Sequence, residues 1–283
     1  MQIFNNKLDL NNYLTTLSST NSTTGFVPTM GALHNGHLSL LKKSLTNNAI
    51  TVISIFVNPT QFNNLNDLEK YPRTLEDDVE KIKTISDKII VYAPSVEDIY
   101  GLNTKSIRYN FDGLENQMEG KFRPGHFDGV GTVVKKLFEI VKPTNAYFGE
   151  KDFQQLQIVK KLVQKYKIPV TIIGCEIFRE PNGLAMSSRN ERLSSAERYQ
   201  ASLIYKTLLS AKELFGTKTA NEVLEFVKKA FNNQTVFELE YFEIANEDTL
   251  LPCKRKIKNK KYRAFIAVFV NNIRLIDTIS LQN

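Results

Sequence analysis

Apolar positions in the first 180 residues follow two alternating patterns. Short apolar runs, typical of buried strands, occur at residues 25–28, 51–57, 88–92, 145–148 and 170–173. Apolar residues at helical spacing occur between and after these runs, at residues 38–45, 75–85, 130–141 and 154–166. An alternation of strands with helices indicates a parallel sheet that has helices on its faces. We therefore predict a doubly wound α/β domain over residues 1–180.

A polar turn at residues 179–183, which contains both proline and glycine, interrupts this order. Ser194 and Glu197 then have the spacing of a capping box, which predicts a helix from there to about Leu214. The remaining pattern predicts a helix at residues 220–231 and strands at residues 237–244, 262–270 and 273–279. Two helices followed by three strands predict a smaller α+β domain over residues 181–283, and a cleft between the two domains is the expected ligand site.

The composition is that of a soluble globular protein, with 42% apolar and 24% charged residues among 283. No apolar run approaches the roughly 18–20 residues that span a bilayer, and the N-terminus lacks the pattern of a signal peptide. The two cysteines, Cys175 and Cys253, are too few for a disulfide framework, so we expect buried thiols in a reducing compartment. These observations predict a cytoplasmic protein with no membrane partner.

The formal net charge of +7 comes from one short stretch, residues 254–263, which holds seven basic residues and no acidic one. Without that stretch, 30 basic residues remain against 30 acidic ones. A nucleic-acid surface spreads its charge over a face and interleaves it with aromatic residues, whereas only Tyr262 accompanies this run. We expect an exposed hairpin loop that leads into a strand, and no nucleic-acid partner; contact with a phosphate or an acidic partner is the alternative.

The strongest chemical signal is the stretch Pro-Thr-Met-Gly-Ala-Leu-His-Asn-Gly-His at residues 28–37, between a strand and a helix. At their spacing, His34 and His37 can face the same side of the first helical turn. Gly36 lets an adenine or a phosphate approach the backbone, and a helix N-terminus attracts anions. This pattern predicts a nucleoside triphosphate site without a P-loop. No third histidine or cysteine is within reach, which disfavours zinc.

A second motif, Leu-Ala-Met-Ser-Ser-Arg-Asn at residues 184–190, follows the interdomain turn. The hydroxyls of Ser187 and Ser188 and the guanidinium of Arg189 can bond phosphate oxygens, and a simple helix cap explains them equally well. Together with His-x-Gly-His, the motif resembles the nucleotidylyltransferase and class I synthetase superfamily. In that superfamily a second motif closes on ATP from the far domain.

Six segments in this order make the resemblance specific; they are residues 28–37, 55–62, 71–74, 123–130, 148–155 and 186–190. The chain resembles the pantoate–β-alanine ligases, which join pantoate to β-alanine with ATP, over essentially its whole length. The resemblance implies a Rossmann-like nucleotide-binding domain that binds ATP and pantoate over residues 1–180. It also implies that residues 181–283 close over the active site, and that the enzyme is a homodimer.

The resemblance implies a mechanism in two steps. The pantoate carboxylate attacks the α-phosphate of ATP, releases pyrophosphate and forms pantoyl adenylate; the β-alanine amine then attacks the activated carbonyl, and AMP leaves. In the first step the protein aligns the carboxylate with the α-phosphate and stabilises the charge that moves onto pyrophosphate. These tasks are assigned to His34, His37, Lys151 and Arg189. Mg²⁺ bridges the phosphates and is assigned to Asp77 or Asp78, for which a solvated helix face is the alternative.

The ATP site implied by the resemblance draws on three segments. Its residues are Met30, Gly31, Ala32, Leu33, His34, Asn35, Gly36 and His37; Gly149, Glu150, Lys151 and Asp152; and Phe178, Met186, Ser187, Ser188 and Arg189. Gly149 permits close backbone approach, Lys151 reaches phosphate, Asp152 accepts from the ribose, and the Phe178 backbone contacts adenine. On their own, the charges of residues 150–152 are equally typical of a helix start.

Pantoate is assigned to Gln61 and Gln155, with Asn58 as a further candidate. Neutral amides hold a carboxylate without the tight ion pair that would blunt its nucleophilicity. The same two glutamines disfavour the alternative of a plain adenylyltransferase, whose acceptor carries a phosphate. A nucleic-acid-binding module is a further alternative and rests only on residues 254–263. Three residues in the matching segments are assigned only to the shape of the cleft or to a subunit contact, with no further role, namely Tyr71, Arg123 and His126.

Overall fold

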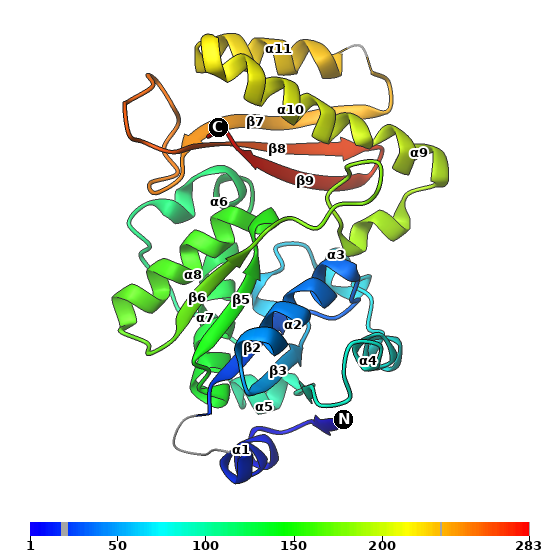
Figure 1. Cartoon of the computed structure of the whole chain (residues 1–283), viewed down its shortest axis with the longest axis vertical. Coiled ribbons are helices and arrows are strands. Elements are labelled where there is room, and N and C mark those ends of the chain that lie inside the picture. Colours follow the sequence, from blue (N-terminus) through cyan, green and yellow to red (C-terminus); the bar gives the residue numbers. More distant parts are fainter. Residues whose placement is uncertain (18–21, 233, 283) are drawn as a thin grey trace. The chain divides into compact units, whose positions relative to one another are not determined.

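Six parallel strands form the first sheet of the computed structural model, which describes residues 1–17, 22–232 and 234–282 (Figure 1). The strands lie in the order β1-β4-β3-β2-β5-β6. Their bounds are β1 Gln2–Phe4, β2 Thr24–Thr29, β3 Ile50–Ile55, β4 Ile90–Tyr92, β5 Asn145–Gly149 and β6 Thr171–Cys175. Every pairing within this sheet is parallel, which confirms the predicted doubly wound α/β fold.

The helices of this part of the chain connect successive strands. They are α1 Lys7–Leu17, α2 Asn35–Asn47, α3 Leu65–Glu69, α4 Leu75–Lys83, α5 Val96–Tyr100, α6 Met118–Phe122, α7 His126–Val141 and α8 Phe153–Tyr166. Short 3-10 turns add η1 Pro59–Gln61, η2 Leu114–Asn116 and η3 Glu150–Asp152. The four predicted helices correspond to α2, α4, α7 and α8, and the pattern did not indicate β1, α1, α3, α5 or α6.

Two neighbouring residues of β2 show that the sheet is covered on both faces. Successive strand residues point to opposite faces. The Phe26 ring meets Phe138 of α7 at 6.2 Å between centroids. Val27 belongs instead to a buried cluster with Leu41 of α2 and Ile53 of β3. The helices α2 and α7 therefore cover opposite faces, and the loop after β2 starts from a strand fixed on both sides.

The chain divides into two compact units: unit 1 is Met1–Glu115, Glu119–Gly149 and Gln155–Cys175, and unit 2 is Asn116–Met118, Glu150–Gln154 and Glu176–Asn283. The sequence predicts the division after residue 180. Along the chain the main change of unit comes after Cys175, and Glu150–Gln154, directly after β5, already belongs to unit 2.

Unit 2 contains a three-stranded antiparallel sheet in the order β7-β8-β9. Its elements are η4 Ser188–Arg192, α9 Ser195–Gln200, α10 Ser202–Thr217, α11 Ala220–Asn232, β7 Phe237–Asn246, β8 Tyr262–Val270 and β9 Ile273–Ser280. The predicted α+β arrangement is confirmed, and so is the capping box of Ser194 with Glu197. The helix that begins there is two helices, because the chain turns at Ala201.

The basic run lies in the loop between β7 and β8, as predicted. Its residues from Lys254 to Lys261 are exposed. Arg263 differs: it lies in β8, is 6% exposed, and forms ion pairs with Glu247 at 3.0 Å and Glu150 at 3.1 Å. One of the seven basic charges is therefore structural. Among the described residues, no helix has the length and apolar character needed to span a membrane.

Candidate active site

Three adjacent strands of the first sheet are followed by the residues predicted to carry the chemistry. The order β3-β2-β5 places β2 in the middle. Gln61 follows β3, the two histidines follow β2, and Gln155 lies in the first turn of α8 after β5. The carboxyl ends of parallel strands share one edge of the sheet, which is where α/β folds bind ligands. The sheet order thus brings three separate motifs to one edge of unit 1.

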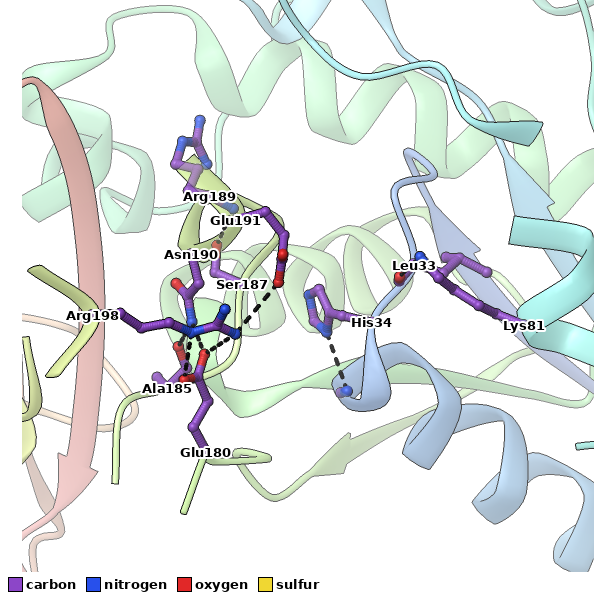
Figure 2. A network of polar contacts seen from close by, with 11 residues as sticks. Leu33, His34, Lys81, Glu180, Ala185, Ser187, Arg189, Asn190, Glu191 and Arg198 are labelled. Atoms are coloured by element: carbon purple, nitrogen blue, oxygen red, sulfur yellow. Dashed lines mark hydrogen bonds and ion pairs between the residues drawn. The ribbon is translucent and has the colours of Figure 1, made fainter. Parts of the chain in front are cut away.

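The loop from β2 to α2 is held by the buried carboxylate of Asp78. One of its oxygens accepts the amide hydrogen of Ala32 at 2.9 Å, and the other accepts that of Leu33 at 2.6 Å. Lys81 donates to the carbonyl of Leu33 at 2.9 Å (Figure 2). Gly31 has a φ of +83°, and a Cβ there would lie 3.0 Å from Asp78, so only glycine suits this position. The loop is therefore fixed by α4 before it reaches His34.

These contacts argue against Asp78 as the predicted Mg²⁺ ligand. Asp78 is completely buried and uses both oxygens on the loop, whereas its neighbour Asp77 is exposed. Adjacent residues on a helix point about 100° apart, so the two carboxylates do not face a common ion. Among the described residues, no three histidine, cysteine or acidic side chains gather as metal ligands. Asp78 therefore does not suit the role of a metal ligand, Asp77 stays a prediction, and no step below is routed through a protein-bound metal.

The two histidines of the His-x-Gly-His motif cap α2 reciprocally. His34 is the N-cap residue, and its Nδ1 accepts the amide hydrogen of Gly36 at 3.1 Å. The Nδ1 of His37 accepts the amide hydrogen of His34 at 3.3 Å, and the ring centroids are 4.0 Å apart. An Nδ1 that accepts carries no proton, so each neutral ring carries its proton on Nε2. The cap thereby sets both rings as Nε2–H donors.

Asn58 and Gln61 form the turn that follows β3. Asn58 is 1% exposed and caps the short turn η1. Its Nδ2 donates to Gln61 Oε1 at 2.9 Å and to the carbonyl of Gly129 at 3.3 Å. Gln61 is 8% exposed, and its Nε2 lies 3.2 Å from the sulfur of Met30. Both amide hydrogens of Asn58 therefore bond to atoms of the protein, one of them to the Gln61 side chain.

The helix α7 clamps the same turn from its N-terminal end. His126 Nδ1 lies 2.9 Å from the carbonyl oxygen of Gln61, and because a carbonyl only accepts, this nitrogen is the donor. Gly129 packs so closely that a Cβ would lie 2.4 Å from the carbonyl oxygen of Thr60. The sequence pattern did not predict that His126 and Gly129 contact this turn. A glycine inside an apolar helix was the available signal, because it indicates a close approach of another segment.

The segment after β5 holds several of the predicted residues, and one of them has a structural partner. Glu150 pairs with Arg263, whose guanidinium also lies 4.0 Å from the centroid of the Phe153 ring. Lys151 pairs with Asp152 at 3.1 Å. Glu150 thus has a structural partner in unit 2. A Cβ at Gly149 would meet no protein atom within 4 Å, so packing does not explain that glycine. Gln155, in unit 1, is partly buried.

The second motif follows a short hairpin in unit 2. Arg179 and Ala185 form an antiparallel bridge, and the Met186 amide donates to the carbonyl of Phe178 at 3.0 Å. Ser187 caps η4 by accepting the amide hydrogen of Arg189 at 3.2 Å. The cap alternative is therefore confirmed for Ser187. Partly buried positions remain for Ser188 and Arg189, which the cap does not explain.

A buried polar network holds this motif in place (Figure 2). Asn190 is completely buried and donates to Glu180 at 2.6 Å and to the carbonyl of Ala185 at 3.1 Å. Arg198 donates twice to the same carboxylate, at 2.8 and 2.9 Å. Burial raises the pKa of Glu180, but the hydrogen bonds from Arg198 and Asn190 outweigh it and hold the pKa below its usual value. The segment that carries Ser187 to Arg189 is therefore anchored at both ends.

The whole chain matches known proteins. A family model described as pantoate-beta-alanine ligase matches residues 2–280. The chain belongs to this family. Pantothenate synthetases from Flavobacterium psychrophilum and Christiangramia forsetii are 69% and 51% identical to it, with all of both chains covered in each comparison.

Solved ligases of the family share the fold of this chain. A pantothenate synthetase from Thermus thermophilus has a TM-score of 0.90 at 36% identity, with full coverage of both chains. A pantoate-beta-alanine ligase from Francisella tularensis, complexed with beta-gamma ATP and β-alanine, has a TM-score of 0.81 at 36% identity and covers 98% of that chain and all of this one. The predicted enzyme class is confirmed: the chain is a ligase, which overrides the adenylyltransferase and nucleic-acid-module alternatives.

Proposed function

We propose that this pantoate–β-alanine ligase works in two steps through pantoyl adenylate. In the first step a pantoate carboxylate oxygen bonds to the α-phosphorus of MgATP, and pyrophosphate leaves. In the second step the β-alanine amine forms a C–N bond to the activated carbonyl, the bond from that carbon to the phosphate oxygen breaks, and the amine loses a proton. The complex of the Francisella relative with ATP and β-alanine supports these two substrates.

The observation that carries this proposal is the edge of unit 1 where β3, β2 and β5 end. The histidine pair follows the central strand β2. On one side of it, β3 leads to the amide of Gln61, which suits a carboxylate, and on the other side β5 leads to Gln155. His34 and His37 offer Nε2–H donors to phosphate oxygens without a net charge of their own. Lys151 and Arg189 supply the positive charge that the departing pyrophosphate needs. Mg²⁺ enters as part of the nucleotide substrate.

Gln61 and Gln155 are proposed to hold pantoate. The Oε1 of Gln61 is occupied by Asn58, so Nε2 is the end of the amide available to an acceptor oxygen. A neutral donor orients the carboxylate and leaves its charge on the attacking oxygen. The remaining ATP residues of the sequence prediction are proposed with one change: Glu150 supports the segment through Arg263, while Gly149, Lys151 and Asp152 face the nucleotide.

Pyrophosphate exchange tests the adenylate directly. The enzyme is incubated with ATP, Mg²⁺, labelled pyrophosphate and pantoate, and without β-alanine. Label should enter ATP only when pantoate is present, because formation of the adenylate is reversible. Exchange that requires β-alanine would exclude a free-standing first step. The resemblance also supports a homodimer and a cytoplasmic location, and sedimentation equilibrium measures the first of these.

A further inference from the structure

A chain of hydrogen bonds runs from Tyr100 to Gln61. Tyr100 is the last residue of α5 and is 7% exposed. Its hydroxyl donates to Asn58 Oδ1 at 2.6 Å, and Asn58 Nδ2 donates to Gln61 Oε1 at 2.9 Å. The hydroxyl of Thr60 also reaches Asn58 Oδ1, at 3.1 Å. All four residues belong to unit 1. Gln61 is thus connected, through one amide, to a tyrosine from another helix.

The orientation of the Asn58 amide is fixed by two backbone groups, a carbonyl that can only accept and an amide that can only donate. The two ends of an amide are almost the same size, so hydrogen bonds decide which way it faces. At Asn58, the carbonyl of Gly129 requires the nitrogen at 3.3 Å, and the amide of Thr60 requires the oxygen at 3.4 Å. Both contacts are long, whereas the bond from Tyr100 is 2.6 Å. The Tyr100 hydroxyl can donate or accept, so it does not choose the orientation, but its bond to Asn58 is the shortest of these contacts and holds the amide in the orientation that the backbone groups set.

We infer that Tyr100 is a positioning residue, which through Asn58 keeps the Nε2 end of Gln61 turned to the substrate. The inference rests on the proposed function, in which Gln61 binds pantoate. A reversed Gln61 amide would present Oε1, a second acceptor, to a carboxylate or hydroxyl oxygen and would repel a carboxylate. Tyr100 therefore contributes to the selection of an acceptor-rich substrate without touching it.

Two further properties suit Tyr100 to this role. Burial raises the pKa of its hydroxyl, so the group stays protonated over the whole range of ordinary assays. The ring is packed independently of the hydroxyl, against Phe56 at 6.4 Å between centroids and beneath the Lys136 ammonium at 5.5 Å. Replacement by phenylalanine therefore removes the hydrogen bond and keeps the packing.

The test compares Tyr100→Phe with Tyr109→Phe by steady-state kinetics. Tyr109 is also buried and aromatic, but its hydroxyl does not bond to Asn58, Thr60 or Gln61. Tyr100→Phe should raise the KM for pantoate by about three- to tenfold, the effect of one lost neutral hydrogen bond, and leave the KM for ATP unchanged. Tyr109→Phe should leave both values unchanged. Equal effects of the two variants, or an ATP effect as large as the pantoate effect, would make Tyr100 merely structural.

A double-mutant cycle separates this inference from the proposed function. Gln61→Ala alone should raise the pantoate KM; if it does not, the assignment of Gln61 to pantoate fails. If it does, then adding Tyr100→Phe to Gln61→Ala should change nothing further, since the amide to be oriented is gone. Additive effects would overturn the inference while leaving Gln61 in place.

Asn58→Asp gives a second, independent variant. The aspartate keeps an acceptor for Tyr100 but presents oxygen to Gln61, which must then turn its Nε2 inwards. The pantoate KM should rise by more than it does in Tyr100→Phe. Wild-type pantoate binding by a folded Asn58→Asp protein would contradict the inferred positioning of Gln61 through Asn58.

Discussion

The contact between α7 and the turn η1 predicts that adding a single methyl group at Gly129 will damage pantoate binding. An alanine Cβ would lie 2.4 Å from the carbonyl oxygen of Thr60 and 2.7 Å from the Cα of Gln61. These are backbone atoms, so no side-chain rotation relieves the clash, and the turn must retreat beyond 3.0 Å. Such overpacking costs about 1–3 kcal/mol, against a gain of up to about 1 kcal/mol from alanine's helix propensity. We expect Gly129→Ala to lose about 1–2 kcal/mol of unfolding free energy.

The displaced turn carries Gln61, so the loss should also appear in binding. The pantoate KM should rise about tenfold, the equivalent of about 1.4 kcal/mol, and the ATP KM should change little. Gly216→Ala is the matched control, because this helical glycine in α10 has no atom within 4 Å of its Cβ. The control should gain stability, by up to about 1 kcal/mol, with unchanged kinetics. Urea unfolding followed by circular dichroism, together with both KM values, decides the matter. A Gly129→Ala protein with wild-type stability and pantoate KM would refute the reasoning.

Three further predictions concern the histidine cap, the buried carboxylate and the thiols. His37→Ala should lower kcat by about 10²–10³, the usual effect of losing one preorganised donor, while His34→Asn should keep the helix cap and lose activity, as measured by AMP release and thermal unfolding. Because the pKa of Glu180 is lowered by folding, its contribution to stability is present above about pH 4.3 and is lost as the pH falls through the folded value. Glu180→Gln should therefore flatten the fall in urea midpoint between about pH 5 and pH 3, and an unchanged slope would count against this. Cys175 and Cys253 are buried, and burial raises the pKa of Cys253, so neither thiol should react with a thiol reagent before unfolding.

The elements that the sequence predicts are those with a strong apolar signal. The strands β3 and β8 consist largely of buried residues and β2 has three in a row, so their pattern identifies them without knowledge of their partners. β1 is a short strand with two exposed residues, and only two residues of α1 are buried. β1 is held by its pairing with β4, and α1 packs against α7, both far away in the sequence. Neither interaction can be predicted from the local sequence pattern.

The same distinction explains the predicted site. Motifs that are local in sequence, such as the histidine pair, form a local structure in the reciprocal cap of α2. The roles that were missed depend on partners distant in sequence. Asp78 bonds to residues 45 and 46 positions earlier, and Glu150 pairs with Arg263, 113 positions later. An acidic residue that satisfies buried amides looks, in sequence, the same as one that binds a metal.

The chemistry of the nucleotide step follows from how the histidines are held. Each Nδ1 accepts a backbone amide hydrogen, so protonating either ring there would set two donors against each other. The cap therefore leaves Nε2 as the donor of each neutral ring, and under the proposed function these donors bond to phosphate oxygens. In the proposed attack, neutral histidine donors form no ion pair with the incoming carboxylate. The positive charge required by pyrophosphate must then come from elsewhere in the chain, which is the role proposed for Lys151 and Arg189. Under the proposed function, the amides of Gln61 and Gln155 orient the nucleophile, whereas the cations of Lys151 and Arg189 stabilise the leaving group.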